Sequence, residues 1–109
     1  MANYYEVSSY NNTYLVTPTR STYQDNGALA IILTCDNGEV YGVLTKNLPE
    51  SSHLTVNEAY VDTNNCRWAH DLIIKNGLGQ PTGKSIRSGW CVYPAYRFNF
   101  DKIPKAEVV

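Results

Sequence analysis

The stretch that decides the fold is ALAIILTCDNGEVYGVLT, residues 28–45. Its first half, residues 28–35, is an almost continuous apolar run, which is typical of a strand buried on both faces in the middle of a sheet. A second β-rich run follows over residues 40–45, and Asn37-Gly38 between the two runs is the strongest short-range signal for a hairpin. The segment therefore predicts two antiparallel strands near the centre of a sheet.

The register of this hairpin depends on the length of its loop. A two-residue turn pairs Cys35 with Val40. The same register pairs Leu33 with Gly42 and gathers the large aliphatic side chains on one face. A three-residue loop beginning at Asp36 shifts the register by one residue and exchanges the cross-strand partners. We prefer the two-residue turn because of the aliphatic face, and we expect the second, mixed face to be only partly covered.

Outside this hairpin the pattern predicts further strands and one helix. A β-branched and aromatic run over residues 13–17, closed by Pro18, indicates an edge strand, and a short strand is expected at residues 59–61. Apolar residues then recur at three- and four-residue spacing, which predicts a helix over about residues 64–76. Thr63 or Asn64 is its expected N-cap, and Asn76-Gly77 is its expected stop. Aromatic residues alternate with polar ones farther on and predict a final strand within residues 86–100.

These elements make up an α+β domain, a mostly antiparallel sheet of four to five strands with one main helix packed on one face. A length of 109 residues fits a single domain. We expect its ordered core at about residues 13–100 and a loose C-terminal tail at about residues 101–109. One helix covers one sheet face, so the other face must meet loops, water or another protein, and both a monomer and a homodimer are compatible with this arrangement.

Charge and composition exclude several classes of protein. The formal net charge is −1, which argues against a basic nucleic-acid binder and equally against an acidic mimic of DNA, so no direct nucleic-acid binding is expected. The longest apolar run is far shorter than the ~20 residues of a membrane-spanning helix. The first residues contain no basic region followed by an apolar one. We therefore expect a cytoplasmic protein without contact with a membrane.

The cysteines and histidines form no catalytic or metal-binding pattern. No Cys-x-x-Cys pair occurs, and the histidines are not spaced from the cysteines as zinc ligands are. The one enzymatic alternative is a nucleophile–base pair such as Cys91 with His70, which no orienting carboxylate or oxyanion hole accompanies. We therefore predict that the protein is not an enzyme and has no catalytic residues, metal or cofactor. The residues considered are Cys35, Cys66, Cys91, His53 and His70.

Two clusters are candidates for recognition. Near the C-terminus, aromatic residues are interleaved with arginine, a combination that dominates protein interfaces and also stacks on bases. The alternative is that these rings pack in the core while the arginines are solvated. The chain also has nine tyrosines, which favour recognition because tyrosine offers a large contact area with few torsions to freeze. The second cluster, before the helix, is either a recognition loop or the helix cap. The candidate binding residues are Arg87, Trp90, Tyr93, Tyr96 and Arg97, and Asp62, Asn64 and Asn65.

A set of segments within residues 13–98 forms a recognisable combination: YLV (14–16), NGALAI (26–31), YGVLTKNL (41–48), YVDTNN (60–65), NGLGQPTG (76–83) and SGWCVYPAYRF (88–98). In this order they resemble a family of small, uncharacterised bacterial domains carried by phages and conjugative elements. The resemblance implies no established enzymatic activity. Some proteins of this kind resemble type II-A anti-CRISPR proteins, which inhibit Cas9, so a host protein such as the Cas9 effector complex is the implied partner.

Two classes of function follow. The leading hypothesis is a non-enzymatic protein of a mobile element that binds a host protein, with inhibition of Cas9 by protein–protein contact as the implied activity. The alternative is a small-molecule binder that sequesters a nucleotide signal of another host defence system. An aromatic-lined pocket in which Arg87 or Arg97 faces a phosphate would support this alternative.

Overall fold

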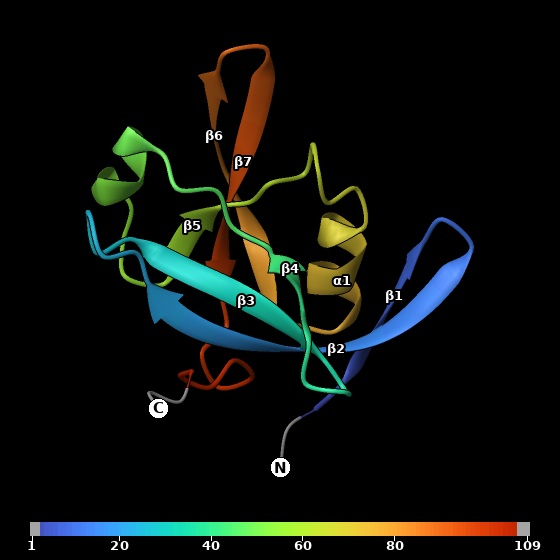
Figure 1. Cartoon of the computed structure of the whole chain (residues 1–109). Helices are drawn as coiled ribbons and strands as arrows, with labels where there is room; N and C mark the ends of the chain where they lie inside the picture. The colour runs from blue at the N-terminus through green and yellow to red at the C-terminus, as the bar shows by residue number, and fades with distance from the viewer. Residues whose placement is uncertain (1–2, 107–109) are drawn as a thin grey trace.

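A computed structural model describes residues 3–106 of the chain (Figure 1). Within this range no helix is long and apolar enough to cross a membrane. The described residues form seven strands, one α-helix and one short 3-10 helix: β1 (Tyr5–Ser9), β2 (Asn12–Thr22), β3 (Leu29–Cys35), β4 (Val40–Val43), η1 (Pro49–His53), β5 (Glu58–Tyr60), α1 (Ala69–Lys75), β6 (Gly79–Ser88) and β7 (Cys91–Phe98).

The strands form two antiparallel sheets. The larger has the order β1-β2-β3-β4 and the smaller the order β5-β7-β6. The α+β class with mostly antiparallel pairing is therefore confirmed, but the expectation of a single sheet of four to five strands is wrong. Strand β1 and the first half of β6 lie in polar or glycine-containing sequence that we did not predict as strands. The predicted single final strand within residues 86–100 is also wrong, because the turn at Gly89-Trp90 divides it between β6 and β7.

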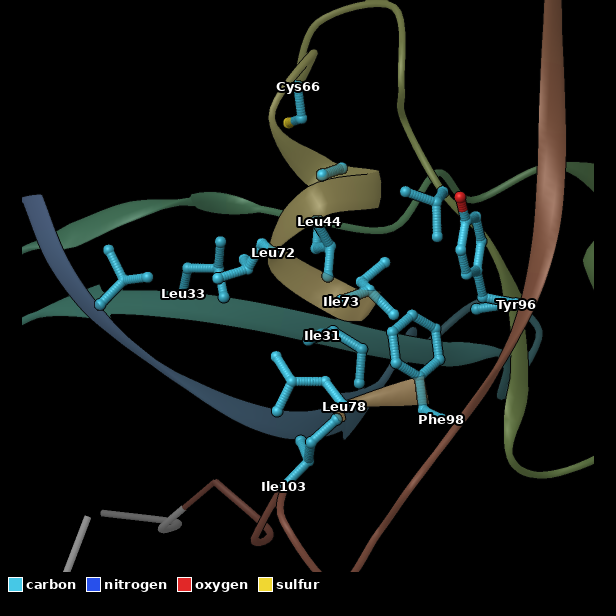
Figure 2. Packing of buried hydrophobic residues seen from close by; sticks show 14 of the residues in the cluster. Ile31, Leu33, Leu44, Cys66, Leu72, Ile73, Leu78, Tyr96, Phe98 and Ile103 are labelled. Atoms are coloured by element: carbon cyan, nitrogen blue, oxygen red, sulfur yellow. The ribbon is translucent and has the colours of Figure 1, made fainter. Parts of the chain in front are cut away.

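The main core lies between the inner face of the larger sheet, α1 and the base of the smaller sheet (Figure 2). Ile31 and Leu33 of β3 are fully buried there, together with Ile73 of α1. Burying a side chain of this size stabilises the fold by roughly 1.5–3 kcal/mol relative to leaving it exposed. The central apolar run thus occupies the position that its sequence predicts.

The hairpin between β3 and β4 has the three-residue loop that we considered as the alternative. The amide of Gly38 donates to the carbonyl of Cys35 at 2.9 Å, and the amide of Cys35 donates to the carbonyl of Glu39 at 2.7 Å. Gly38 has a φ of +89°, which fits a tight turn closed by a left-handed residue. The predicted pair of Cys35 with Val40 is therefore wrong.

A bulge then restores part of the preferred register. Thr34 pairs with Val40 but Leu33 pairs with Gly42, so Tyr41 is the extra residue on its strand. The predicted pair of Leu33 with Gly42 is confirmed for this reason. The outer face of the larger sheet is only partly covered, as expected, and Val43 and Val40 are 43% and 67% exposed on it.

The helix begins five residues later than the predicted residue 64. The amide of Cys66 donates to the carbonyl of Asp62 at 2.8 Å, and the Asp62 carboxylate accepts hydrogen bonds from the backbone and side-chain nitrogens of Asn65. These bonds hold a turn that competes with helical pairing. The N-cap position of α1 is Trp68, so the prediction of Thr63 or Asn64 as the N-cap is wrong. The interpretation of Asp62, Asn64 and Asn65 as part of the helix cap is wrong for the same reason.

The helix ends where its sequence predicts. The amide of Leu78 donates to the carbonyl of Ile73 at 2.9 Å, and that of Gly77 donates to the carbonyl of Ile74 at 3.3 Å. With Gly77 at a φ of +66°, this is a Schellman motif. Leu78 folds back into the core and is fully buried.

Strand β2 continues through Pro18 and lies between two other strands, although we expected an edge strand that stops there. Its neighbour β1 reaches only as far as Val16, so β2 is locally an edge beyond that point. The amide of Arg20 points away from β3, toward the carbonyl of Pro104 at 2.9 Å. Backbone amides two residues apart in a strand point to the same side, so the amide that Pro18 lacks would also point away from β3. On that side β1 no longer pairs with β2, and no hydrogen bond of the sheet is lost.

The described chain is ordered beyond both expected limits of the core. Strand β1 precedes residue 13 and buries Val7 at 2% exposure. Ile103 is fully buried in the main core, so the segment that we expected to be a loose tail packs against the body at least as far as Ala106. The end of the expected tail, residues 107–109, lies outside the described residues.

Candidate functional site

The hairpin of β6 and β7 extends well beyond the body of the molecule (Figure 1). Its base, from Gly79 to Pro81, pairs with β7 inside the smaller sheet, and its outer part pairs again from Ser85. Between these parts three residues of β6 lie opposite Ala95 alone. A bulge of this kind bends a strand and increases its twist, so the outer hairpin leaves the sheet. We call residues 85–94 the arm.

A two-residue turn closes the arm. Ser88 pairs with Cys91, and Gly89 and Trp90 stand between them. Gly89 has a φ of +62°, the conformation that a primed hairpin turn requires at its first central position and that glycine adopts without steric penalty. Trp90 takes the second central position, and its side chain is 100% exposed.

The exposure of Trp90 is not explained by the stability of the fold. A tryptophan buries up to about 250 Å² when it packs, which at ~25 cal/mol per Å² is worth up to about 6 kcal/mol. Because the indole of Trp90 is fully exposed, it contributes none of this stabilisation. The other large exposed side chains of the arm are Val92, at 47%, and Arg87, which pairs with Val92 across the strands. The tip thus combines an indole, an aliphatic side chain and one positive charge, and the arm contains no acidic residue.

Two of the candidate aromatic residues belong to the core. Tyr96 is 3% exposed in the main core, where its hydroxyl shares a 2.5 Å hydrogen bond with Nδ1 of His70. Tyr93 is 7% exposed and packs in a smaller cluster with Leu48 and Tyr60. Burial raises the pKa of both Tyr96 and Tyr93 above the ordinary value of a phenol. Neither ring is available to a partner, so for them the core interpretation holds.

Arg97 is engaged near the base of the hairpin. Its Nη2 lies 3.5 Å from Oε2 of Glu58, whose other oxygen lies 3.8 Å from Nζ of Lys84. The carboxylate is buried and also accepts a 3.2 Å hydrogen bond from the amide of Thr55. That amide, helped by the two positive charges, holds the pKa of Glu58 below its ordinary value. Arg97 therefore serves as a counter-ion to Glu58 and does not join Trp90.

The second candidate cluster lines a different surface. Asn64 and Asn65 border a groove between the β1–β2 turn and the segment that leads into α1, with a volume of about 790 Å³. Asp62 does not border this groove but holds Asn65 through a 3.0 Å hydrogen bond from Nδ2 of Asn65 to Oδ2 of Asp62. The eight candidate residues are thus divided among the arm, the base of its hairpin, the groove and the protein interior.

The groove contains residues that the sequence analysis did not select, above all Tyr10, Arg67 and Trp68. Tyr10 and Asn11 form the β1–β2 turn with φ values of +50° and +67°. The one available sequence signal was the pair Asn11-Asn12, which favours a turn. The approach of this turn to Trp68 depends on the tertiary fold and has no local signature.

A family model described as "Domain of unknown function (DUF4313)" matches residues 19–107, a range that includes the arm but not β1 or the β1–β2 turn. Comparisons with curated proteins and with solved structures found no match.

Proposed function

We propose that this chain, which belongs to the DUF4313 family of domains of unknown function, is a non-enzymatic binding protein that contacts a partner protein through the arm. The observation that carries the proposal is the full exposure of Trp90 at the tip of a projecting hairpin. Tryptophan and arginine are the residue types most enriched at interface hot spots, and a single hot spot contributes ~2 kcal/mol or more.

The charge of the arm favours a protein partner over a nucleic acid. Arg87 is its only charged residue, with Lys84 just before it in β6. Nucleic-acid affinity depends on several neutralised phosphates, and the whole chain has a formal net charge of −1. A protein pocket that accepts an indole and an aliphatic side chain needs no such excess of positive charge.

The specific partner that we propose is a host protein of a bacterial cell, and the activity is that of a mobile-element protein that inhibits Cas9 by protein contact in the cytoplasm. This part of the proposal rests on the sequence resemblance. The near-neutral charge is consistent with direct contact on the effector, since mimicry of DNA requires an acidic surface. The test is DNA cleavage by several purified Cas9 homologues with and without the protein, combined with co-purification.

Two variants separate the arm from the rest of the surface. Trp90→Ala removes the tip, and we expect it to weaken binding about tenfold or more, since a hot spot is worth ~2 kcal/mol. Tyr10→Ala is the matched control, because Tyr10 is 95% exposed on the turn of another hairpin. Binding that survives Trp90→Ala unchanged would reject the arm as the site.

The assignment of Cas9 as the partner and the assignment of the arm as the binding site can be rejected independently. If no Cas9 homologue is inhibited or co-purifies, the Cas9 assignment is wrong. Capture of another bacterial protein that depends on Trp90 would then retain the arm as a protein-binding site. The nucleotide-signal alternative is less well supported, because Arg97 is already compensated by Glu58 and Arg87 lies on the arm rather than in an aromatic pocket.

A further inference from the structure

The groove beside α1 consists of two adjoining spaces. Next to the space of about 790 Å³ lies a second one of about 380 Å³. Both are bordered by Ser9, Tyr10, Asn65 and Trp68, so the two spaces adjoin and form one groove. Two adjoining spaces suit a chain-like ligand of several units rather than one small compact molecule.

Aromatic rings follow each other along the groove. The ring centre of Tyr41 lies 5.0 Å from that of Tyr14 and 5.4 Å from that of Trp68. The bulge described above makes Tyr41 the extra residue of its strand at this point. Tyr10 stands at the rim, 95% exposed, with a φ of +50° that is unfavourable for a bulky side chain. The ring contacts of Tyr41 with Tyr14 and Trp68 explain the positions of these three rings. Packing within the fold does not explain why a tyrosine occupies the exposed position 10.

The polar groups of the groove include both hydrogen-bond donors and hydrogen-bond acceptors. Arg67 only donates, Asp71 only accepts, and the amide of Asn64 does both. Nδ2 of Asn65 donates to Asp62, and the side-chain oxygen of Asn65 is a further acceptor group. Among residues 3–106 neither Arg67 nor Asp71 takes part in a salt bridge, and their charges sum to zero.

This composition distinguishes between classes of ligand. A nucleotide requires an excess of positive charge for its phosphates, and Asp71 cancels the charge of Arg67. A proline-rich peptide presents chiefly carbonyl acceptors and leaves Asp71 without a donor. A neutral sugar chain presents hydroxyl groups that both donate and accept, and its flat C–H faces pack on aromatic rings. We propose that the groove binds a neutral carbohydrate of a few units, at a site separate from the arm.

The two tryptophans allow a direct test, since one lies in the groove and the other on the arm. In the Trp90→Phe variant all tryptophan emission comes from Trp68. We would titrate this variant with maltotetraose, cellotetraose and the tetramer of N-acetylglucosamine, and in parallel with a proline-rich decapeptide and AMP. The expected result is a saturable change of emission with at least one sugar and none with the peptide or AMP.

Groove variants in the same background complete the test. Tyr10→Ala and Asp71→Asn should each weaken sugar binding, by about two- to tenfold for the aromatic ring. Tyr4→Ala is the control, an exposed tyrosine that does not border the groove. No saturation by any sugar up to ~10 mM, saturation by the peptide or AMP, or unchanged binding in both groove variants would overturn the proposal. Each of these results leaves protein binding by Trp90 unaffected.

Discussion

Arg20 of β2 lies with its guanidinium carbon 4.2 Å from the ring centre of Phe100, and its Nε donates a 2.9 Å hydrogen bond to the carbonyl of Ile103. The backbone of Arg20 also bonds to Pro104 and Ala106. One residue of the larger sheet therefore holds the segment that follows β7. This contact is the physical reason why residues expected to form a loose tail are part of the fold.

We expect Arg20→Met to lower the free energy of unfolding by about 1–3 kcal/mol. The substitution keeps an apolar stem but removes a hydrogen bond from a charged donor and a cation–π contact, which are worth about that amount together. Urea unfolding followed by circular dichroism measures the change. Arg87→Met, on the exposed arm, is the control and should stay within ~0.5 kcal/mol of the parent protein. Equal effects of the two substitutions would mean that Arg20 does not fasten the C-terminal segment.

At Gly79 the backbones of β6 and β7 approach each other too closely to leave room for a side chain. A Cβ atom at this position would overlap the carbonyl oxygen of Arg97 and would lie 3.1 Å from Cα of Phe98. Both are backbone atoms that cannot turn aside, so we expect Gly79→Ala to destabilise the protein by about 2–4 kcal/mol. Thermal unfolding would report this as a clear loss of Tm.

A second strand glycine provides the matched control for that experiment. A Cβ atom at Gly42 of β4 would meet no atom of the described chain within 4 Å, and Gly42 has no left-handed φ. Gly42→Ala should therefore be neutral or stabilise the protein by up to ~1 kcal/mol through the unfolded state. Similar destabilisation by both alanines would show that strand propensity, rather than the close approach at Gly79, determines the result.

The buried carboxylate of Glu58 makes stability depend on pH. Its pKa is lowered in the folded protein, chiefly by the amide of Thr55, from an ordinary value of 4.5. Its contribution is therefore complete above pH 4.5 and is lost as the pH falls from there through the folded pKa. Urea midpoints measured from about pH 6 to about pH 3 should decrease more steeply for the parent protein than for Glu58→Gln. Glu39→Gln, exposed in the β3–β4 loop, should retain the slope of the parent.

The sequence was informative where local chemistry determines structure. The β3–β4 hairpin and the glycine stop of α1 depend on neighbouring residues, and both were predicted. The start of β6 was not, because Gly79 and Pro81 are typical of loops. In the fold, Gly79 permits the backbone contact with β7, and Pro81 lies on an outer strand of its sheet, where a missing amide is tolerated.

The candidate residues divide for a similar reason. Trp90, Tyr93 and Tyr96 have the same aromatic character, and composition alone cannot separate the exposed indole from the two buried phenols. Whether each ring is exposed or buried depends on the turn at Gly89 and on which elements cover β7. The groove residues Tyr10 and Trp68 meet only through the tertiary fold. Pairing across such sequence distances has no local pattern, so these contacts lay beyond sequence reasoning.

The three thiols should differ sharply in reactivity. Cys66 lies at the top of the main core, 9% exposed, and burial together with the nearby Asp62 carboxylate raises its pKa to about 11 (Figure 2). At pH 8 only about one molecule in a thousand then carries the reactive thiolate at this position. Cys35 and Cys91 are partly exposed. With a disulfide reagent such as Ellman's, we expect two thiols to react in the folded protein and the third only after unfolding in urea.

The assignment of the slow thiol is checked by substitution. Cys66→Ala should leave the two fast reactions and abolish the slow one, whereas Cys91→Ala should remove a fast one. The alanine at position 66 also leaves a small cavity beside α1, and the lost methylene-sized volume should cost about 1 kcal/mol in urea. If all three thiols of the folded parent protein react at one rate, the turn from Asp62 to Cys66 opens far more readily than its hydrogen bonds imply. The part of the groove that Cys66 borders would then not be a preformed surface.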